Sequence, residues 1–436
     1  MFSMYLQRYS IGAITLVVWA VYFLLIAVVP FHSAYSHLFE AIAYQVLFVV
    51  LTLATIVIAD EWARSQSIKV AAPAPLAAPS IRFASWFAVA LATFSVICLA
   101  IDKILLLHID YSGGLCLART QMTALGETRT GSVSSFFSVA GNLFGTSSFV
   151  ALGLALVSNS SRRAFYGLMS VALVLVLLLS IVTASRSVLM LLVGFTMGFA
   201  ALRVALGGPL PRLIWLDWLV IVVILAVVGG VTLNVFNCRA DASGMSSLEY
   251  LDSFSTFLGS DTTDLSGPGD SGGVARAQGL VGMVALYAIH SVYTFDGILS
   301  LPPDQGQILF GNVLYLLGKT GLVIPPDATW SLSGRFASLP GGMYHDFGLA
   351  GLIGGAIGLG GLAGVAGVLF TRRPSSILLL ALGSSTFAVM VLSPIHPATE
   401  FATFPFIVFD FILVAIVTEL RHRLGRVAGR ATATQG

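Results

Sequence analysis

The chain has 436 residues, of which 57% are hydrophobic and only 10% are charged, and its mean hydropathy is +0.93. A soluble protein of this length needs more charge to cover its surface, so the composition predicts an integral membrane protein. The formal net charge of +2 argues against a nucleic-acid partner, which would require a basic stripe. Three cysteines are too few for a disulfide scaffold and lack the spacing of a metal site.

Ten apolar runs are long enough to cross a membrane, because a spanning helix needs about 20 mostly apolar residues. Backbone groups inside lipid must be paired within their own segment, so we expect each run to be a helix. The runs cover residues 11–30, 38–59, 83–102, 134–157, 164–184, 188–206, 213–235, 346–370, 375–393 and 401–419. The fourth is the weakest, since Asn142 and several small residues interrupt it. The predicted fold is therefore an all-α integral membrane protein with about ten transmembrane helices.

The distribution of lysine and arginine predicts the orientation of these helices. If the N-terminus lies inside, the inner segments hold 14 of the 22 basic residues, although the outer segments are longer in total. Cytoplasmic loops are enriched in such residues, so we expect both termini in the cytoplasm.

This topology divides the chain into three parts. Residues 1–235 form a bundle of seven spans, residues 236–345 form an outer loop, and residues 346–436 form three spans with a basic tail. Long loops usually carry function. Within the outer loop, residues 279–300 and 307–324 are apolar enough to form helices that lie on or dip into the outer face, bracketed by prolines. A second outer segment covers residues 103–133.

The enrichment of basic residues in cytoplasmic loops does not explain arginines on the outer side. Seven of the eight outer basic residues lie in the two outer segments, namely Lys103, Arg119, Arg129, Arg239, Arg276, Lys319 and Arg335. The eighth, Arg186, lies in a short Ser-Arg-Ser turn where the sixth span begins with its N-terminus outward. Free N–H groups and the helix dipole bind anions there, so we predict a phosphate site. The alternative is an anchor for lipid headgroups.

The stretch from Gly341 to Gly348 leads into the eighth span from outside. It contains His345, a candidate general base, and Asp346, which we expect to cap the first turn of that helix. The alternative for His345 is an interfacial ring. The histidines at positions 290 and 396 are interpreted as packed or interfacial residues.

Asp410 lies near the middle of the tenth span, where a carboxylate is costly and is a functional candidate by default. Its alternative is a hydrogen-bonded acid that faces the bundle interior.

Two other patterns concern tertiary contacts. Cys116 and Cys238 both lie outside in oxidising surroundings, and the sequence leaves open whether they pair. The glycine pairs Gly351/Gly355 and Gly354/Gly358 predict close helix packing.

Three features together resemble the oligosaccharide repeat-unit polymerases, also called O-antigen polymerases, which are multispan glycosyltransferases. The segment LLLSIVTASRSVLMLLVGF at 177–195 is similar to the family's paired spans with an arginine turn. The segment GGMYHDFGLAGLIGGAIGLGGLAG at 341–364 is similar to the family's Asp-Phe-Gly entry into the next span. A single large outer loop precedes the last three spans.

The resemblance implies a GT-C-like fold in the bacterial inner membrane. It also implies an enzyme that moves a growing glycan from undecaprenyl diphosphate onto a second lipid-linked repeat unit, in O-antigen, capsule or exopolysaccharide synthesis. Arg186 and Arg335 would hold the donor diphosphate, and His345 or a loop carboxylate would take the acceptor proton. The expected substrate-binding residues are Arg119, Arg129, Arg239, Arg276, Tyr344 and Asp346. No metal or cofactor is required, and the expected partners are membrane lipid, a chain-length regulator and a flippase.

Three other functions stay open, one of which is a structural or assembly membrane protein without catalytic activity. An O-antigen ligase-like enzyme would use the same donor with a different acceptor. A lipid-linked oligosaccharide flippase or secondary transporter would draw on Asp410 and the glycine-rich spans, although the chain shows no internal repeat of the kind that many transporters carry.

Overall fold

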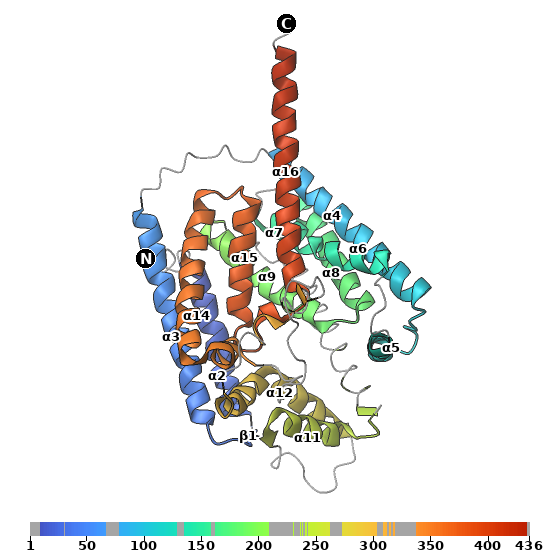
Figure 1. Ribbon diagram of the computed structural model, residues 1–436, viewed down its shortest axis with the longest axis vertical. Helices are drawn as coiled ribbons and strands as arrows, with labels where there is room; N and C mark the ends of the chain where they lie inside the picture. Colours follow the sequence, from blue (N-terminus) through green and yellow to red (C-terminus); the bar gives the residue numbers. More distant parts are fainter. Residues whose placement is uncertain are drawn as a thin grey trace.

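The computed structural model describes residues 9–29, 31–66, 78–128, 135–157, 162–208, 243–261, 273–302 and 337–433, with a few residues between 230 and 241 and between 308 and 318. Figure 1 shows a bundle of long helices. The helices are α2 (Ser10–Val28), α3 (Leu38–Ser65), α4 (Ala78–Ala100), a π-helical turn (Ile101–Leu106), α5 (Leu115–Thr128), α6 (Phe136–Phe144), α7 (Ser147–Val157), α8 (Arg162–Val182), α9 (Arg186–Ala205), α11 (Ser247–Leu258), α12 (Gly273–Leu299), α14 (Leu339–Arg372), α15 (Ile377–Leu392), a 3-10 turn (Ala398–Glu400) and α16 (Phe404–Ala433). Two short strands, β1 (His32–Ser33) and β2 (Ser260–Asp261), pair antiparallel.

The multispan, all-α prediction is confirmed. Within the described ranges, eight helical segments are long and apolar enough to cross a membrane. Seven of them overlap the first six predicted runs and the eighth, while the shorter α15 and the helix α16 overlap the ninth and tenth. The predicted seventh run lies outside the described residues, apart from Gly230. Large apolar side chains such as Leu24, Ile58 and Ile97 are exposed on the bundle's surface, as lipid-facing residues would be.

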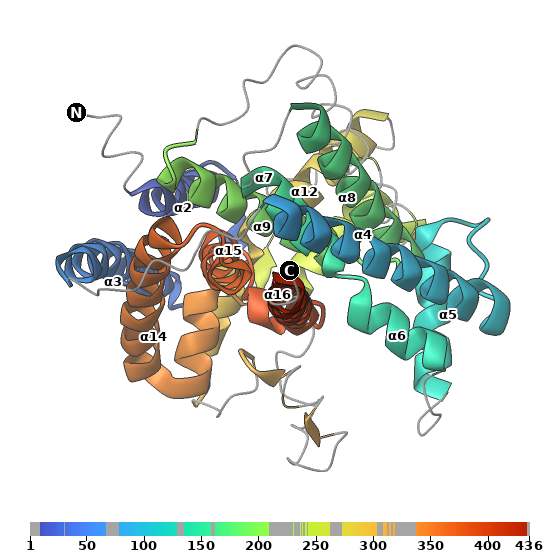
Figure 2. The same cartoon turned by 90° about the horizontal axis from the view of Figure 1, so that it is seen from above.

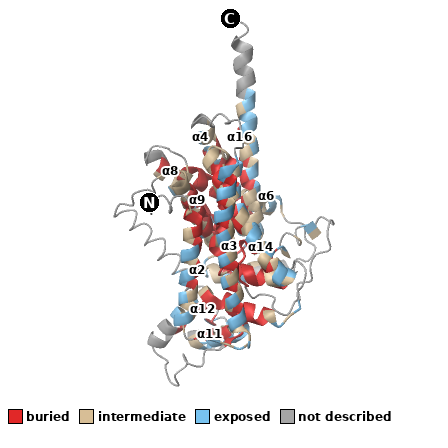
Figure 3. Cartoon of the chain, turned by 90° about the vertical axis from the view of Figure 1, so that its left-hand side faces the viewer, coloured by how far each residue is buried: buried red, intermediate tan, exposed pale blue. Residues whose placement is uncertain are grey.

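The remaining apolar segment, Gly279–Leu299 within α12, was predicted as a helix at the outer face rather than a span. Figures 1 and 3 show α11 and α12 together at one end of the bundle, inclined to the long helices. We call this the loop end. Helix α12 contacts α2, α3 and α14, and its residues Leu286, Ile289, Val292 and Phe295 are fully buried. Length and composition alone therefore do not make α12 a span.

Arginines gather at the opposite end of the bundle, which we call the basic end. Arg372 in the last turn of α14 donates to the carbonyl of Ala63 in α3 at 2.8 Å. The Arg203 guanidinium, in the last turn of α9, lies 5.8 Å from the Phe165 ring centroid at the start of α8. Arg421 of α16 lies 3.9 Å from the ring centroid of Phe83. Basic side chains therefore cap this end of the packed helices, from which α16 extends (Figure 1).

Helix α9 lies at the centre of the bundle, in contact with α15, α7, α8 and α2 (Figure 2). Its residues Leu191, Phe195 and Phe199 are fully buried. Because other helices pack against α9 on several sides, the residues of its first turn, at the loop end, are held in a fixed position.

Two of the predicted spans are interrupted. The fourth run divides into α6 and α7 at Gly145 and Thr146, so its weakness in sequence corresponds to a break in the helix. The eighth begins at Leu339, with Ser338 as its N-cap, earlier than predicted. At Gly348 the backbone has φ 65° and ψ −162°, a conformation open essentially only to glycine. A short helical segment therefore precedes the long spanning part of α14.

The two predicted glycine pairs of α14 have different outcomes. Gly351 and Gly355 are closely packed, against Met343 of the helical segment that precedes the Gly348 kink. A Cβ on Gly354 or Gly358 would meet no atom within 4 Å among the residues that the structure describes, so that part of the chain does not pack closely on them. The close approach to α3 instead uses Gly360 and Gly364, where a Cβ would lie 2.4 Å from the Thr52 carbonyl oxygen and 2.6 Å from the Ile56 carbonyl oxygen. Periodicity identified a small-residue helix but not the face that meets its neighbour.

We predict that Gly364→Val lowers the free energy of unfolding by about 2–3 kcal/mol, because α14 must move away from α3. Gly361→Val is the matched control, since no atom lies within 4 Å of a Cβ at that position. The measurement is thermal unfolding of the detergent-purified protein. Equal melting temperatures for the two variants would contradict the observed packing.

Candidate functional site

A cavity of about 250 Å³ opens at the loop end of the bundle. Four segments that are far apart in the sequence contribute to it: α5, the start of α9, α12, and the connection between α15 and α16. Its lining residues are Arg119, Ser185, Arg186, Ser187, Met190, Tyr287, His290, Ile395, His396, Glu400, Phe401 and Ala402. Its walls are thus partly apolar, with two guanidiniums and one carboxylate among the lining groups.

Arg186 is the first residue of α9, and its side chain is half-buried. Its guanidinium carbon lies 5.6 Å from the ring centroid of Phe236 and 5.3 Å from that of Tyr287. Aromatic faces attract a guanidinium and restrict its orientation. The cation therefore has a fixed place beside the N–H groups of the first turn of α9, which have no partners within the helix.

The turn that precedes Arg186 has an unusual backbone. Ala184 has a positive φ of 44°, which costs free energy for a residue with a Cβ. The turn is held by Ser180 Oγ, which donates to the Ser185 carbonyl at 2.8 Å, and by a 2.7 Å hydrogen bond between the hydroxyls of Ser185 and Ser187. These contacts fix the direction in which α9 presents its N-terminus.

Arg119 reaches the same turn from α5. Its Nη1 donates to the Ala184 carbonyl at 3.0 Å, and the Tyr111 hydroxyl donates to the Val182 carbonyl at 2.6 Å. The carbonyl groups at the end of α8 are therefore covered by donors from the 103–133 segment. Arg119 thus both lines the cavity and braces the turn that carries Arg186.

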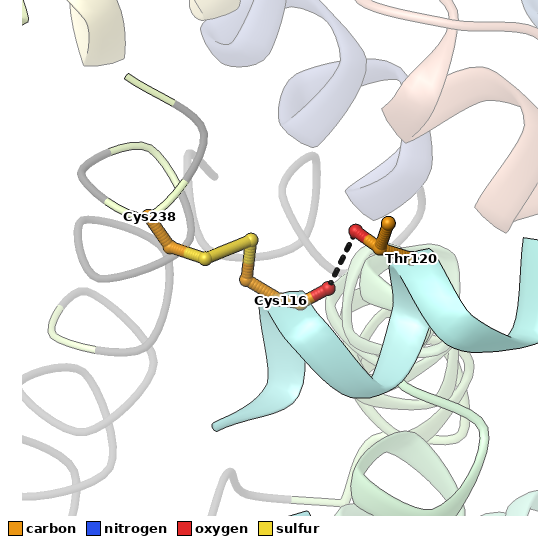
Figure 4. Close-up of a disulfide and its surroundings, with 3 residues drawn as sticks. All are labelled: Cys116, Thr120 and Cys238. Atoms are coloured by element: carbon orange, nitrogen blue, oxygen red, sulfur yellow. Dashed lines mark hydrogen bonds between the residues drawn. A yellow bond between two sulfur atoms is a disulfide. The ribbon is translucent and has the colours of Figure 1, made fainter. Parts of the chain in front are cut away.

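A disulfide joins the two outer segments beside this site. Cys116 of α5 is bonded to Cys238, with their Cα atoms 6.2 Å apart (Figure 4). Cys116 lies one helical turn before Arg119, and Cys238 lies two residues after Phe236. The bridge therefore connects the segment that braces the Arg186 turn with the segment that stacks on the Arg186 guanidinium.

His396 and Glu400 line the same cavity from the connection between α15 and α16. His396 Nδ1 is 3.6 Å from Glu400 Oε2, and the His396 ring packs 4.3 Å from the Phe401 ring, centroid to centroid. Burial, together with the nearby charge of Asp346, raises the pKa of the Glu400 carboxyl to about 8. Burial and the neighbouring His290 lower the pKa of His396 to about 3. At neutral pH this pair holds one proton, which resides mainly on Glu400.

The predicted base His345 lies behind the cavity rather than in its lining. His345 and Asp346 are only 3% and 1% exposed. Asp346 was predicted to cap its own helix. Instead its carboxylate accepts hydrogen bonds from the backbone N–H groups of Ile308 and Leu309 at 3.1 and 2.9 Å, because α14 begins earlier and Asp346 faces another segment. His345 Nδ1 lies 3.0 Å from the same carboxylate.

Of the other predicted site residues, the structure brings Arg119 and Arg186 together in one cavity. Tyr344 does not line it and stacks on Tyr44 at 5.5 Å between ring centroids. Arg129, Arg239 and Arg335 lie outside the described residues, and for Arg276 only the backbone, in α12, is described.

Sequence reasoning missed Glu400 and Tyr287, and it assigned His396 a packing role. A signal existed for two of them, because His396 and Glu400 lie four residues apart in the short outer turn SPIHPATE. Nothing in the sequence indicated that this turn would meet α12 and the start of α9.

We predict that the Cys116–Cys238 bridge forms in the native protein and that it stabilises the site. Labelling of unfolded protein should modify one thiol before reduction, that of Cys98, and three after it. The double variant Cys116→Ser/Cys238→Ser should lose stability, by up to about 5 kcal/mol if the chain-entropy account holds. Cys98→Ala, which keeps the bridge, is the control. Three reactive thiols before reduction would contradict this pairing.

Comparison of the chain with protein-family models, curated proteins and solved structures finds no match. Its function must therefore be inferred from the chemistry of the cavity.

Proposed function

We propose that this protein is a glycosyltransferase that polymerises undecaprenyl-diphosphate-linked oligosaccharide repeat units, as in O-antigen, capsule or exopolysaccharide synthesis. The observation that supports this most directly is the placement of Arg186, Arg119 and the N-terminus of α9 around one cavity. Two guanidiniums beside a helix N-terminus favour a ligand with several negative charges, and phosphate oxygens match guanidinium geometry.

Two independent features support an orientation with the cavity outside the cytoplasm. Arg203, Arg372 and Arg421 lie at the basic end, and positive residues favour the cytoplasmic side. The disulfide lies at the loop end, and disulfides persist in oxidising compartments. We therefore place the protein in the bacterial inner membrane, with both termini in the cytoplasm and the cavity at the outer leaflet.

Outside the cytoplasm, neither ATP nor a nucleotide sugar is at hand. A sugar transfer there needs a donor that was activated beforehand and has already crossed the membrane, and a glycan on a lipid diphosphate meets both conditions. A flippase that delivers these lipids and a chain-length regulator are the expected partners. A GT-C-like fold is part of the same proposal.

In the proposed reaction, a hydroxyl of the acceptor repeat unit attacks the anomeric carbon of the donor glycan. The bond from that carbon to the diphosphate oxygen breaks, and the diphosphate leaves with the electron pair. Arg186 and Arg119 would offset the charge that develops on the leaving group. Because Phe236 and Tyr287 already hold the Arg186 guanidinium, it needs little reorganisation during the reaction. Arg335 keeps its predicted role as a second diphosphate contact.

We predict that Arg186→Ala abolishes the long-chain glycan ladder in cells that lack the chromosomal gene, whereas wild type restores it. Loss of one fixed donor at a developing charge reduces a rate by about 10²–10³-fold. Arg186→Lys should restore activity only in part, since lysine cannot bind two phosphate oxygens in the same planar manner.

Arg423→Ala is the matched control, because Arg423 is exposed and paired with Glu419 on α16, which extends from the basic end. The measurement is surface-glycan chain length at equal protein level. A full ladder with Arg186→Ala would refute this assignment. A single transfer of glycan to a different carrier in place of a ladder would identify the ligase-like alternative.

One observation favours a second function, transport. Asp410 of α16 is fully buried, and it accepts a hydrogen bond from Thr146 Oγ1 at 2.6 Å where α6 gives way to α7. Its other oxygen has no hydrogen-bond partner among the residues that the structure describes. A broken helix beside a buried carboxylate is the kind of site that secondary transporters use.

Asp410→Asn separates the two functions, because it keeps the shape of the side chain and removes its proton-binding site. The polymerase proposal expects a ladder close to wild type, since Asp410 does not line the cavity. The measurement is chain length together with the amount of lipid-linked repeat unit that reaches the outer leaflet. Loss of outer-leaflet repeat units would favour transport.

A further inference from the structure

We propose that Glu400 is the catalytic base that takes the proton of the acceptor hydroxyl, and that His396 is the residue that positions it. This inference rests on the proposed function, because it assigns the residue that removes the acceptor proton in the same glycosyl transfer. It replaces His345, the base expected from the sequence, with a residue in a different segment of the chain.

Access to the cavity distinguishes Glu400 from the other acid–base groups. Its side chain is 25% exposed, whereas those of His396 and His345 are 4% and 3% exposed. Among the described lining residues, Glu400 carries the only carboxylate. A general base must come within hydrogen-bond reach of the proton that it removes, and Glu400 meets this requirement better than either histidine.

The connection that carries Glu400 is fixed against the rest of the molecule. Ser291 Oγ of α12 donates to the Pro394 carbonyl at 2.5 Å. The Glu400 N–H donates to the Pro397 carbonyl at 3.0 Å within the 3-10 turn. The buried His396 ring, packed on Phe401, then holds its Nδ1 3.6 Å from the carboxylate. The base therefore has a defined position relative to the diphosphate site.

Charged and titratable groups from several elements share the cavity with Glu400 or lie near it. Arg119 of α5 and Arg186 of α9 contribute positive charge to the cavity, and His290 of α12 lies beside His396. Asp346 of α14 contributes a negative charge that raises the pKa of Glu400 in the same direction as burial does. The resulting pKa of about 8 is close to working pH, where a general base is most effective.

In the step itself, an oxygen of the ionised Glu400 carboxylate accepts the acceptor proton while the acceptor oxygen bonds to the anomeric carbon. The electron pair of the broken carbon–oxygen bond leaves on the diphosphate, which Arg186 and Arg119 hold. Glu400 ends protonated and returns its proton to water when the product departs. No further reactant is needed.

The test measures glycan polymerisation by membranes that contain the full-length protein, supplied with lipid-linked repeat units extracted from the gene-deletion strain. The wild-type rate should rise with pH through a midpoint near 8, because the ionised base accumulates above its pKa. At pH 7 the rate should be about a tenth of its maximum. Glu400→Gln should lower the maximal rate by about 10²–10⁴-fold and remove the pH dependence.

Two further variants complete the design. Glu419→Gln, at an exposed glutamate of α16 paired with Arg423, is the matched control and should behave as wild type. His396→Gln should slow the reaction by about tenfold and move the midpoint to higher pH, because the neutral imidazole ring, 3.6 Å from Glu400 Oε2, no longer orients and supports the ionised carboxylate. A role in folding alone would reduce the amount of protein and leave the midpoint in place, and that result would overturn the positioning role.

Binding of inorganic pyrophosphate to the purified protein separates the inference from the proposed function. Glu400→Gln should keep or tighten this binding, because it removes negative charge near the two arginines, whereas Arg186→Ala should weaken it. If wild type polymerises and Glu400→Gln polymerises as fast, Glu400 is not the base, although the polymerase proposal stands. If Glu400→Gln also loses pyrophosphate binding, its role is structural and the inference fails. If wild type forms no polymer from these lipids, the proposed function itself fails.

Discussion

The arrangement of the loop end depends on the placement of one positive charge at the start of the most central helix. Arg186 begins α9, and Phe236 and Tyr287 stack on its guanidinium from two other segments. A guanidinium in so apolar a protein needs partners that fix it without cancelling its charge, and aromatic faces do this. The α5 helix, the Cys116–Cys238 bridge and the inclined α12 all bring groups to this one position.

The two ends of the bundle differ in the polar groups that they carry and in what those groups contact. At the basic end, Arg203 and Arg372 donate to backbone carbonyls near the C-termini of α7 and α3, where such charges are favourable. At the loop end, the inclined α12 meets α5, the start of α9 and the α15–α16 connection, and these four segments form the cavity. The long apolar helices between the ends hold these two polar layers at a fixed separation (Figure 3).

The spans could be predicted because lipid imposes a simple rule of length and composition on every crossing helix. The position of Arg186 at the start of a helix could be predicted, because the apolar run that follows it is long enough to span and begins just after the Ser-Arg-Ser turn. The place of Glu400 and His396 in the cavity could not be predicted, because it depends on how the α15–α16 connection meets α12, a contact that no local pattern encodes. The same limit explains why Asp346 was expected to cap its own helix and why Gly354 and Gly358 of α14 were expected to mediate close packing. In each case the sequence identified a chemical type, while tertiary packing decided its partner.

The most direct test of the central claim is an experimental structure of the protein in lipid nanodiscs that contain undecaprenyl diphosphate. The account predicts that the two phosphate groups lie in the cavity, against the Arg186 and Arg119 guanidiniums and the first turn of α9, with the prenyl chain directed to the lipid. A diphosphate bound elsewhere, with this cavity unoccupied by the lipid, would contradict it.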